Sequence, residues 1–394
     1  MSEWKKVKLG EICERVTSGG TPKANVSSYY NPPTIPWLKT KEVNYCRITE
    51  TENYISEEGL KNSSAKLISP NSVIIAMYGQ GDTAGRIAIN KIPLATNQAC
   101  CNLTIDKSKA DYEFIYYQLC TLYDKLVSLK AGAAQPNLNA RIIKNLEIIM
   151  PSLPIQHRIA SILSRYDSLI ENYQKQIKLL GEAAQRLYKE WFIDLHFPGH
   201  ENTKIVDGVP EGWEKKRLID LVDVQYGYAF DGKLFNSSGE GMPILRIRNI
   251  PDGITSDYTT EEAQDCYIVH NGDIVVGMDG IFHINSWSGG DAYLVQRACS
   301  FRPKEECMKG FIFQAIQEPI KFFEKTLVGA TVAHLGKKHI DSIELCIPKN
   351  FELYQPFSKF YNQRQGLLSQ IRLLTEARDR LIPKLISGLI VVNS

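Results

Sequence analysis

The stretch "IASILSRYDSLIENYQKQIKLLGEAAQRLYKEW", residues 159–191, decides the fold, because its apolar side chains recur at alternating intervals of four and three residues. These are the intervals of the seam that a coiled-coil helix presents to its partner. The spacing predicts one long helix from Ile155 to about Phe192. Its seam residues, with the aromatic ones expected as core packing, are Ile159, Leu163, Tyr166, Ile170, Tyr173, Ile177, Leu180, Ala184, Leu187 and Trp191.

A second and weaker copy of this helix lies near the C-terminus, where "LLTEARDRL" repeats "LLGEAAQRL". Arg364 and Arg378 interrupt its seam, and Pro383 is expected to kink or end it. Two helices with one apolar stripe each bury both stripes by packing on each other, so an antiparallel coiled coil is predicted. The second seam consists of Phe360, Leu367, Ile371, Leu374, Leu381 and Leu385.

The rest of the chain repeats as well, with a period of about 200 residues. "EWKKVKLGEICERV" recurs as "GWEKKRLIDLVDV", "IPWLKTKEV" as "MPILRIRNI", "NSVIIAMYG" as "GDIVVGMDG" and "NQAC" as "QRAC". "GAAQPNLNARIIKNLEIIMP", from Gly132, recurs as "GATVAHLGKKHIDSIELCIP", from Gly329. Five blocks in one order indicate an internal duplication with a pseudo-two-fold axis.

Each copy alternates β-rich runs with helical stretches, which predicts one α/β (α+β) domain per copy. The expected organisation is a first domain, a long helix with its linker, a second domain and a C-terminal long helix. The predicted bounds are 1–152, 153–199, 200–349 and 350–394.

Composition excludes several classes of protein. The net charge is +2, so nucleic-acid binding would need a local basic face rather than a global excess. The nine cysteines form no C-x-x-C pair, which argues against a zinc site and, without an apolar leader, favours reduced thiols in a cytoplasmic protein. No apolar run approaches the ~18 residues of a membrane span.

The tripeptide Asn31-Pro32-Pro33 raises the question of methyl transfer, because Asn-Pro-Pro-aromatic motifs hold a flipped base in amino-methylating DNA methyltransferases. Here the fourth residue is Thr34, which has no ring to stack on the base. A glycine-rich cofactor turn is also missing. The tripeptide is therefore interpreted as a loop.

The duplicated domains and paired helices resemble the DNA-specificity subunit of prokaryotic type I restriction–modification enzymes over essentially the whole chain. The motifs that carry the resemblance are the "WKKVKLGE" opening, "GGTP" with "IPWL", and "IMPSLPIQHRIASIL". The second copy departs from the family pattern at "MPILRIRNI" and "FELYQPFSKF".

The resemblance implies two tandem target recognition domains and a non-catalytic role. The implied partners are double-stranded DNA and two methyltransferase (modification) subunits, and no membrane is involved. The resemblance leaves open whether nuclease/translocase (restriction) subunits join the complex. S-adenosylmethionine, ATP and Mg would be bound by the partner subunits, so no cofactor and no catalytic or metal-binding residue is expected in this chain. With half-sites at both ends of a helix spanning roughly 57 Å, about 17 base pairs of DNA, an asymmetric bipartite target is expected.

Polar residues in the loops that follow the repeated strands are the candidates for DNA contact, since base edges need donors and acceptors and phosphates need cations. They are Lys39, Lys41, Tyr78, Gln80, Arg86, Asn97, Gln98, Arg246, Arg248, Asp279, His283, Gln296 and Arg297.

Three alternatives stay open at this point. The chain could be the specificity subunit of a related fused or type IIB-like system. It could be a non-catalytic coiled-coil protein whose globular ends bind other proteins. It could also be a methyltransferase or nuclease with unrecognised motifs, against which the missing cofactor and metal motifs count.

Overall fold

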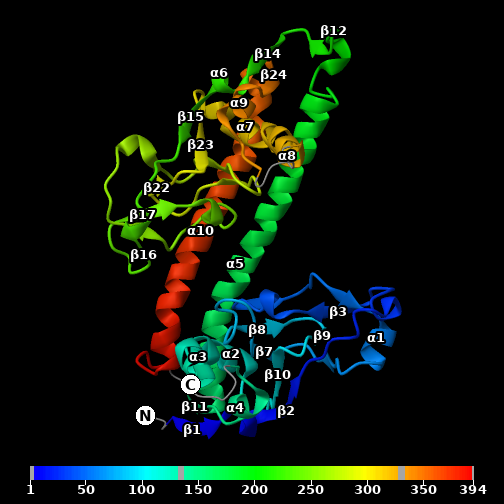
Figure 1. The fold of residues 1–394 in the computed structure, drawn as a ribbon, viewed down its shortest axis with the longest axis vertical. Coiled ribbons are helices and arrows are strands. Elements are labelled where there is room, and N and C mark those ends of the chain that lie inside the picture. The colour runs from blue at the N-terminus through cyan, green and yellow to red at the C-terminus, as the bar shows by residue number, and fades with distance from the viewer. Residues whose placement is uncertain (1–3, 132–136, 327–332, 393–394) are drawn as a thin grey trace. The chain divides into compact units, whose positions relative to one another are not determined.

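A computed structural model describes residues 4–131, 137–326 and 333–392 (Figure 1). The first residues of the last repeated block, 132–136 and 329–332, lie outside the described part in both copies. The chain divides into two compact units, Met1–Ser168 with Glu376–Ser394, and Leu169–Thr375. Each unit contains one globular domain together with segments of both long helices.

The first domain is built around a five-stranded sheet in the order β2-β10-β7-β8-β4, beside a four-stranded sheet β5-β3-β9-β6 and a two-stranded ribbon β1-β11. Its strands are β1 Lys5–Lys8, β2 Cys13–Ser18, β3 Ile35–Leu38, β4 Cys46–Ile48, β5 Tyr54–Ile55, β6 Leu67–Ile68, β7 Val73–Ala76, β8 Ile87–Asn90, β9 Leu94–Thr96, β10 Cys100–Ile105 and β11 Glu147–Met150. Its helices are η1 Leu9–Ile12, η2 Ser27–Tyr29, η3 Thr40–Glu42, α1 Glu57–Lys61, α2 Tyr112–Cys120, α3 Tyr123–Ala131 and α4 Ala140–Lys144.

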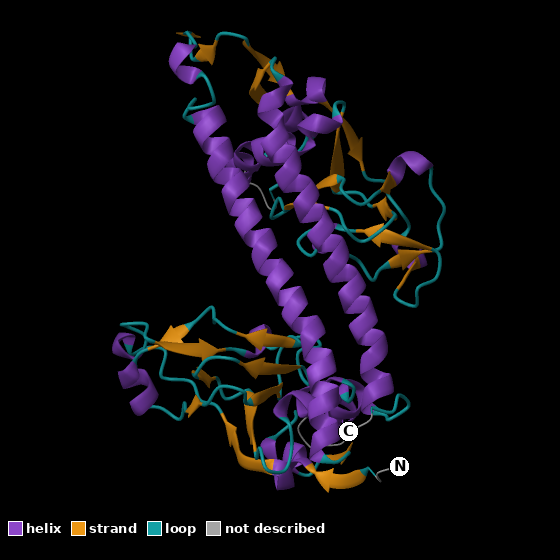
Figure 2. Ribbon diagram, turned by 180° about the vertical axis from the view of Figure 1, so that it is seen from behind, coloured by secondary structure: helices purple, strands orange, loops and turns teal. Residues whose placement is uncertain are grey.

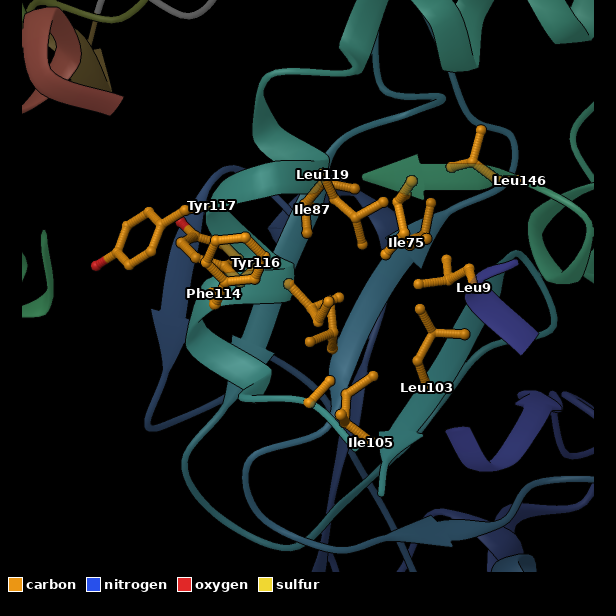
Figure 3. Packing of buried hydrophobic residues seen from close by; sticks show 14 of the residues in the cluster. Leu9, Ile75, Ile87, Leu103, Ile105, Phe114, Tyr116, Tyr117, Leu119 and Leu146 are labelled. Carbon is orange, nitrogen blue, oxygen red and sulfur yellow. The ribbon is translucent and has the colours of Figure 1, made fainter. Parts of the chain in front are cut away.

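The core of this domain follows from its uninterrupted apolar strands. All four residues of β7 and of β8 are buried, as expected for strands covered on both faces. Helix α2 begins at the side chain of Asp111, which accepts the backbone N–H groups of Glu113 and Phe114, and it packs against the sheet. Figure 3 shows Ile75, Leu103 and Leu119 among the side chains of this core.

The second domain repeats the arrangement with a four-stranded sheet β15-β23-β20-β21, a five-stranded sheet β16-β18-β17-β22-β19 and the ribbons β14-β24 and β12-β13. Its strands are β12 Ile205–Val206, β13 Val209–Pro210, β14 Trp213–Arg217, β15 Val222–Tyr226, β16 Phe235–Asn236, β17 Met242–Leu245, β18 Tyr258–Thr259, β19 Ile268–Val269, β20 Ile274–Gly277, β21 Ile284–Ser286, β22 Ala292–Leu294, β23 Ala298–Pro303 and β24 Glu344–Pro348. Its helices include η5 His200–Asn202, α6 Leu218–Leu221, η6 Gly232–Leu234, η7 Ile247–Asn249, η8 Asp265–Tyr267, η9 Glu306–Met308, α7 Lys309–Ala315, α8 Gln317–Thr326 and α9 Lys337–Asp341.

The predicted duplication is confirmed, although β4 of the first domain and β16 of the second have no counterpart in the described part of the other copy. β3 pairs in parallel with β9, and β17 pairs in parallel with β22. The aligned Leu9 and Leu218 each begin a short helix and are fully buried. The carbonyl of Met77 accepts the N–H of Leu138 at 3.1 Å, and the carbonyl of Met278 accepts the N–H of Leu335 at 2.7 Å.

The two long helices are also confirmed. α5 spans Leu153–Tyr188 and continues into a π-helical turn, η4 Lys189–Ile193. α10 spans Gln355–Ile386 after the short helix η10 Phe351–Tyr354, and both are uninterrupted helices in Figure 2. Helix α10 passes through Pro383 and ends one turn later.

Within each unit the two helices pack with opposite chain directions. In the first unit the core contains the start of α5, with Ile159 and Leu163, and the end of α10, with Leu385. In the second unit the end of α5, with Tyr188, packs on the start of α10, with Phe357. Every predicted seam residue is buried or half-buried, which supports the antiparallel pairing.

The two arginines that interrupt the second seam have specific partners. Arg378 lies 2.6 Å from the carboxylate of Asp167 on α5. Arg364 donates to the side-chain oxygen of Asn285 at 2.7 Å, and its guanidinium lies 5.4 Å from the ring centre of Phe313. Each arginine that interrupts the apolar pattern therefore forms a specific polar contact.

Candidate nucleic-acid interface

In the first domain, strand pairing brings three loops to one edge. Because β3 and β9 run parallel, their carboxyl ends reach the same edge, where the N–H of Asn97 donates to the carbonyl of Leu38 at 2.9 Å. The N–H of Met77, directly after β7, donates to the carbonyl of Ala99 at 2.7 Å. We call the polar residues brought together here the first rim: Lys39, Tyr78, Asn97 and Gln98.

A glycine allows the chain after β2 to pass close to the backbone that follows β9. A Cβ at Gly19, just after β2, would lie 2.2 Å from the carbonyl oxygens of Thr96 and Asn97, so no side chain fits there. Gly227 occupies the same place in the second domain, where a Cβ would lie 2.2 Å from the carbonyl oxygen of Val295. Next to Gly19 the hydroxyl of Thr21 donates to the side-chain oxygen of Gln98.

The predicted cations of the first domain differ in availability. Lys39 lies 5.1 Å from the ring centre of Trp37, half-buried at the rim. Lys41 is exposed but forms an ion pair with Glu52, whose hydrogen bond raises the pKa of Lys41. Arg86 is bound to Asp82 at 2.6 Å, and Gln80 is exposed in the same loop.

The second domain forms an equivalent edge, where the N–H of Val295 donates to the carbonyl of Leu245 at 3.0 Å and that of Met278 to the carbonyl of Arg297 at 2.8 Å. We call its polar residues the second rim: Arg246, Asp279, Gln296 and Arg297. His283 lies outside this rim, opposite Gly277, as Arg86 lies opposite Ala76 in the first domain.

The cations of the second domain match those of the first in place. Arg246 lies 5.4 Å from the ring centre of Phe235, as Lys39 lies over Trp37. Arg248 is exposed and binds the carboxylate of Asp257 at 2.6 Å, as Lys41 binds Glu52. In both domains one cation of the predicted pair lies over an aromatic ring and the other is held by a carboxylate.

Asp279 is the centre of a polar cluster that the sequence predicted only in part. Its carboxylate accepts hydrogen bonds from Arg297 and, at 2.6 Å, from Nδ1 of His334. Burial alone would raise the pKa of Asp279, but the hydrogen bonds from His334 and Arg297 outweigh it and lower this pKa.

His334 was not among the predicted site residues. The signal for it lay in the last repeated block, where a polar residue precedes the aligned leucines Leu138 and Leu335. The corresponding residue of the first domain is Asn137, which is exposed next to Leu138. In each domain the backbone hydrogen bond of this leucine brings the loop that contains it to the rim. No local sequence motif encodes this long-range contact.

The tripeptide Asn31-Pro32-Pro33 forms an exposed loop between η2 and β3. The Asn31–Pro32 peptide bond is cis. Over the described ranges no three His, Cys, Asp or Glu side chains gather as metal ligands, and no helix is long and apolar enough to cross a membrane.

Comparison with known proteins places this architecture in a family. The profile of the type I restriction modification DNA specificity domain matches residues 1–180 and 210–371. The chain is 28% identical to the type I restriction enzyme MjaIX specificity subunit of Methanocaldococcus jannaschii, covering 98% of this chain and 93% of that protein. It is 26% identical to the MjaVIII specificity subunit of the same organism, covering 88% and 82%.

Among solved structures, the type I restriction-modification S subunit from M. genitalium has a similar fold, with a TM-score of 0.57 at 16% identity, covering 100% of this chain and 97% of that one. The two profile matches coincide with the two copies of the repeat and include most of α5 and about half of α10. The chain therefore belongs to the type I restriction modification DNA specificity domain family, of which it carries two domains.

Proposed function

We propose that this chain reads an asymmetric, two-part sequence in double-stranded DNA and positions the modification subunits of a type I restriction–modification complex on it. One observation carries the proposal. The two rims have the same backbone scaffold but different side chains at equivalent places. Tyr78 corresponds to Asp279, and Ala99 corresponds to Arg297, since the N–H groups of the aligned Met77 and Met278 donate to their carbonyls. A shared scaffold with different donors and acceptors suits two readers of different base sequences.

The recognition residues form two groups by chemistry. Tyr78, Asn97 and Gln98 of the first rim, and Asp279, Gln296 and Arg297 of the second, carry the hydrogen-bonding groups that base edges require. Lys39, Lys41, Arg246 and Arg248 supply cations for phosphates. Arg86, Gln80 and His283 border the rims and belong to the same proposed surface.

The partners we propose are two modification subunits, one for each copy of the repeat. Leu179 of α5 and Leu373 of α10 hold the same position in the repeated helix sequence, and their exposed fractions are 63% and 57%. We propose that this exposed leucine, repeated at the same place in both helices, is part of the surface that each modification subunit contacts. S-adenosylmethionine, ATP and Mg, and any restriction subunit, would come with these partners, and this chain would have no catalytic activity alone.

Mapping methylated bases across the genome with and without this gene tests the proposal. We expect one two-part, asymmetric methylation motif to disappear when the gene is deleted. An unchanged methylome, together with no sequence preference in DNA binding by the assembled complex, would instead favour a coiled-coil protein that binds other proteins.

We predict that Asn31→Ala leaves methylation by the assembled complex within a few-fold of normal, because Thr34 stands where the methyltransferase motif has its stacking ring. The measurement is methyl transfer to the target duplex, with the isolated chain as the control, for which no transfer is expected. A complete loss of transfer with DNA binding intact would show that the tripeptide takes part in catalysis.

Replacing the rim cations is predicted to weaken DNA binding and flatten its dependence on salt. Lys39→Ala and Arg246→Ala should each lower the slope of log affinity against log salt concentration by about one, the value for one lost phosphate contact. Lys41→Ala and Arg248→Ala should change the slope less, because DNA must first displace Glu52 or Asp257. Unchanged slopes for all four variants would remove these residues from the DNA surface.

A further inference from the structure

The cluster of Asp279, Arg297 and His334 has a buried side and an exposed side. The side chain of Asp279 is 14% exposed, whereas those of Arg297 and His334 are 66% and 59% exposed. Asp279 therefore lies beneath the surface and holds both neighbours through its two carboxylate oxygens. Such an arrangement fixes the direction of a surface guanidinium that would otherwise rotate freely.

The backbone conformation of Arg297 indicates that an arginine at this position does not serve the stability of the fold. Its φ is 71°, in the left-handed region that side chains with a Cβ disfavour. The turn is held in this conformation because the carbonyl of Arg297 accepts the N–H of Met278 at 2.8 Å. A glycine would adopt the same turn without strain, so the arginine needs another reason.

The chemistry of the held guanidinium provides that reason. An arginine has five N–H donors, and the structure uses one of them on Asp279. A paired set of the remaining donors matches O6 and N7 of guanine in the major groove, the commonest specific arginine contact with DNA. Contact with a phosphate would not require a buried carboxylate to orient the group, since it depends mainly on charge.

We propose that Arg297, oriented by Asp279 and His334, reads the O6 and N7 edge of one guanine in the half-site of the second domain. This inference rests on the proposed function and names the base that this rim selects. Arg297 is the contacting residue, and Asp279 and His334 are positioning residues.

We expect the guanine requirement in only one of the two half-sites, because the first domain has no arginine at the place of Arg297. The residues at the equivalent places are Tyr78, Ala99 and Asn137, none of them charged. Gln98 is oriented by the hydroxyl of Thr21 rather than by a carboxylate. Ala99 offers no side-chain donor to O6 and N7 of guanine, so the two rims should differ in base preference.

Selection from a pool of randomised duplexes by the complete complex, without ATP, tests the inference. Arg297→Gly should lose the preference for guanine at one position of one half-site by on the order of ten- to a hundred-fold, with all other positions unchanged. Its melting temperature should not fall, because glycine relieves the strained φ. Asp279→Asn should lose part of the same preference at the same position, which a merely structural role would not produce.

Two further variants serve as matched controls. Arg217→Ala removes another exposed arginine of the second domain, one that is paired with Asp220 at 2.9 Å, and should leave base preference unchanged. Gln98→Ala should alter a position in the other half-site only.

Two results would overturn the inference. One is an Arg297→Gly complex with unaltered base preference. The other is equal weakening on every duplex with a salt slope lower by about one, which would identify a phosphate contact. If the unaltered complex selects no sequence from the pool, the proposed function fails and the inference fails with it.

Discussion

Replacing Asp167 by alanine is expected to lower the free energy of unfolding by about 3 kcal/mol, because a buried network of charges would lose the carboxylate that its members share. The side chain of Asp167 is 10% exposed and accepts hydrogen bonds from Tyr117 and, at 2.6 Å, from Arg378. A third partner, Arg47, lies 3.8 Å from it and is 5% exposed. Removing the carboxylate would leave Arg378 with only the exposed Asp379 and Arg47 with Glu113, at 3.2 Å, among the ion pairs described for them.

Thermal and urea unfolding of the full chain would measure this loss. A change of this size corresponds to a fall in melting temperature of roughly 6 to 12 °C for a unit of this length. Asp379→Ala is the matched control, since Asp379 also binds Arg378, at 2.8 Å, but is 56% exposed. It should cost less than ~1 kcal/mol, as exposed ion pairs do. Equal losses for both variants would show that burial of the Asp167 network contributes nothing.

Adding one heptad to each long helix is expected to change the DNA target itself. Seven residues inserted after Asn172 in α5 and after Arg372 in α10 keep both seams in phase. They lengthen each helix by about 10.5 Å, or about three base pairs of duplex. The unspecified gap between the half-sites should grow by the same amount. Affinity for the original target should fall on the order of a thousand-fold, toward non-specific binding.

The expectation depends on α5 acting as a spacer, and its 36 residues correspond to about 54 Å of helix. Methylome mapping of the double-insertion variant would measure the gap directly. A heptad inserted in α5 alone is the control, because it places the two seams out of step and should lower stability instead of moving the gap. A gap that stays the same in a stable double-insertion variant would mean that the helices do not set the spacing.

The sequence by itself determined the architecture of this protein. The intervals of four and three that begin at Ile159 predicted a long helix, and α5 covers them. The ordered repeats predicted two related domains, and the parallel pairs β3·β9 and β17·β22 confirm them. Both features can be detected in the sequence. Helical periodicity recurs over neighbouring residues, because burial of a continuous apolar stripe acts on all of them together, and duplication keeps the repeated blocks in one order.

Only the tertiary structure decided which polar side chains meet. Arg378 looked like a defect in an apolar seam, but its carboxylate partner, Asp167, lies on the other long helix. His334 belongs to the last repeated block but was not among the predicted site residues, and Asp279 gains it as a partner from a loop 55 residues away. Such pairs leave no local pattern, because a buried charge needs a counter-charge near in space, and the folded chain brings that counter-charge from any distance along the sequence.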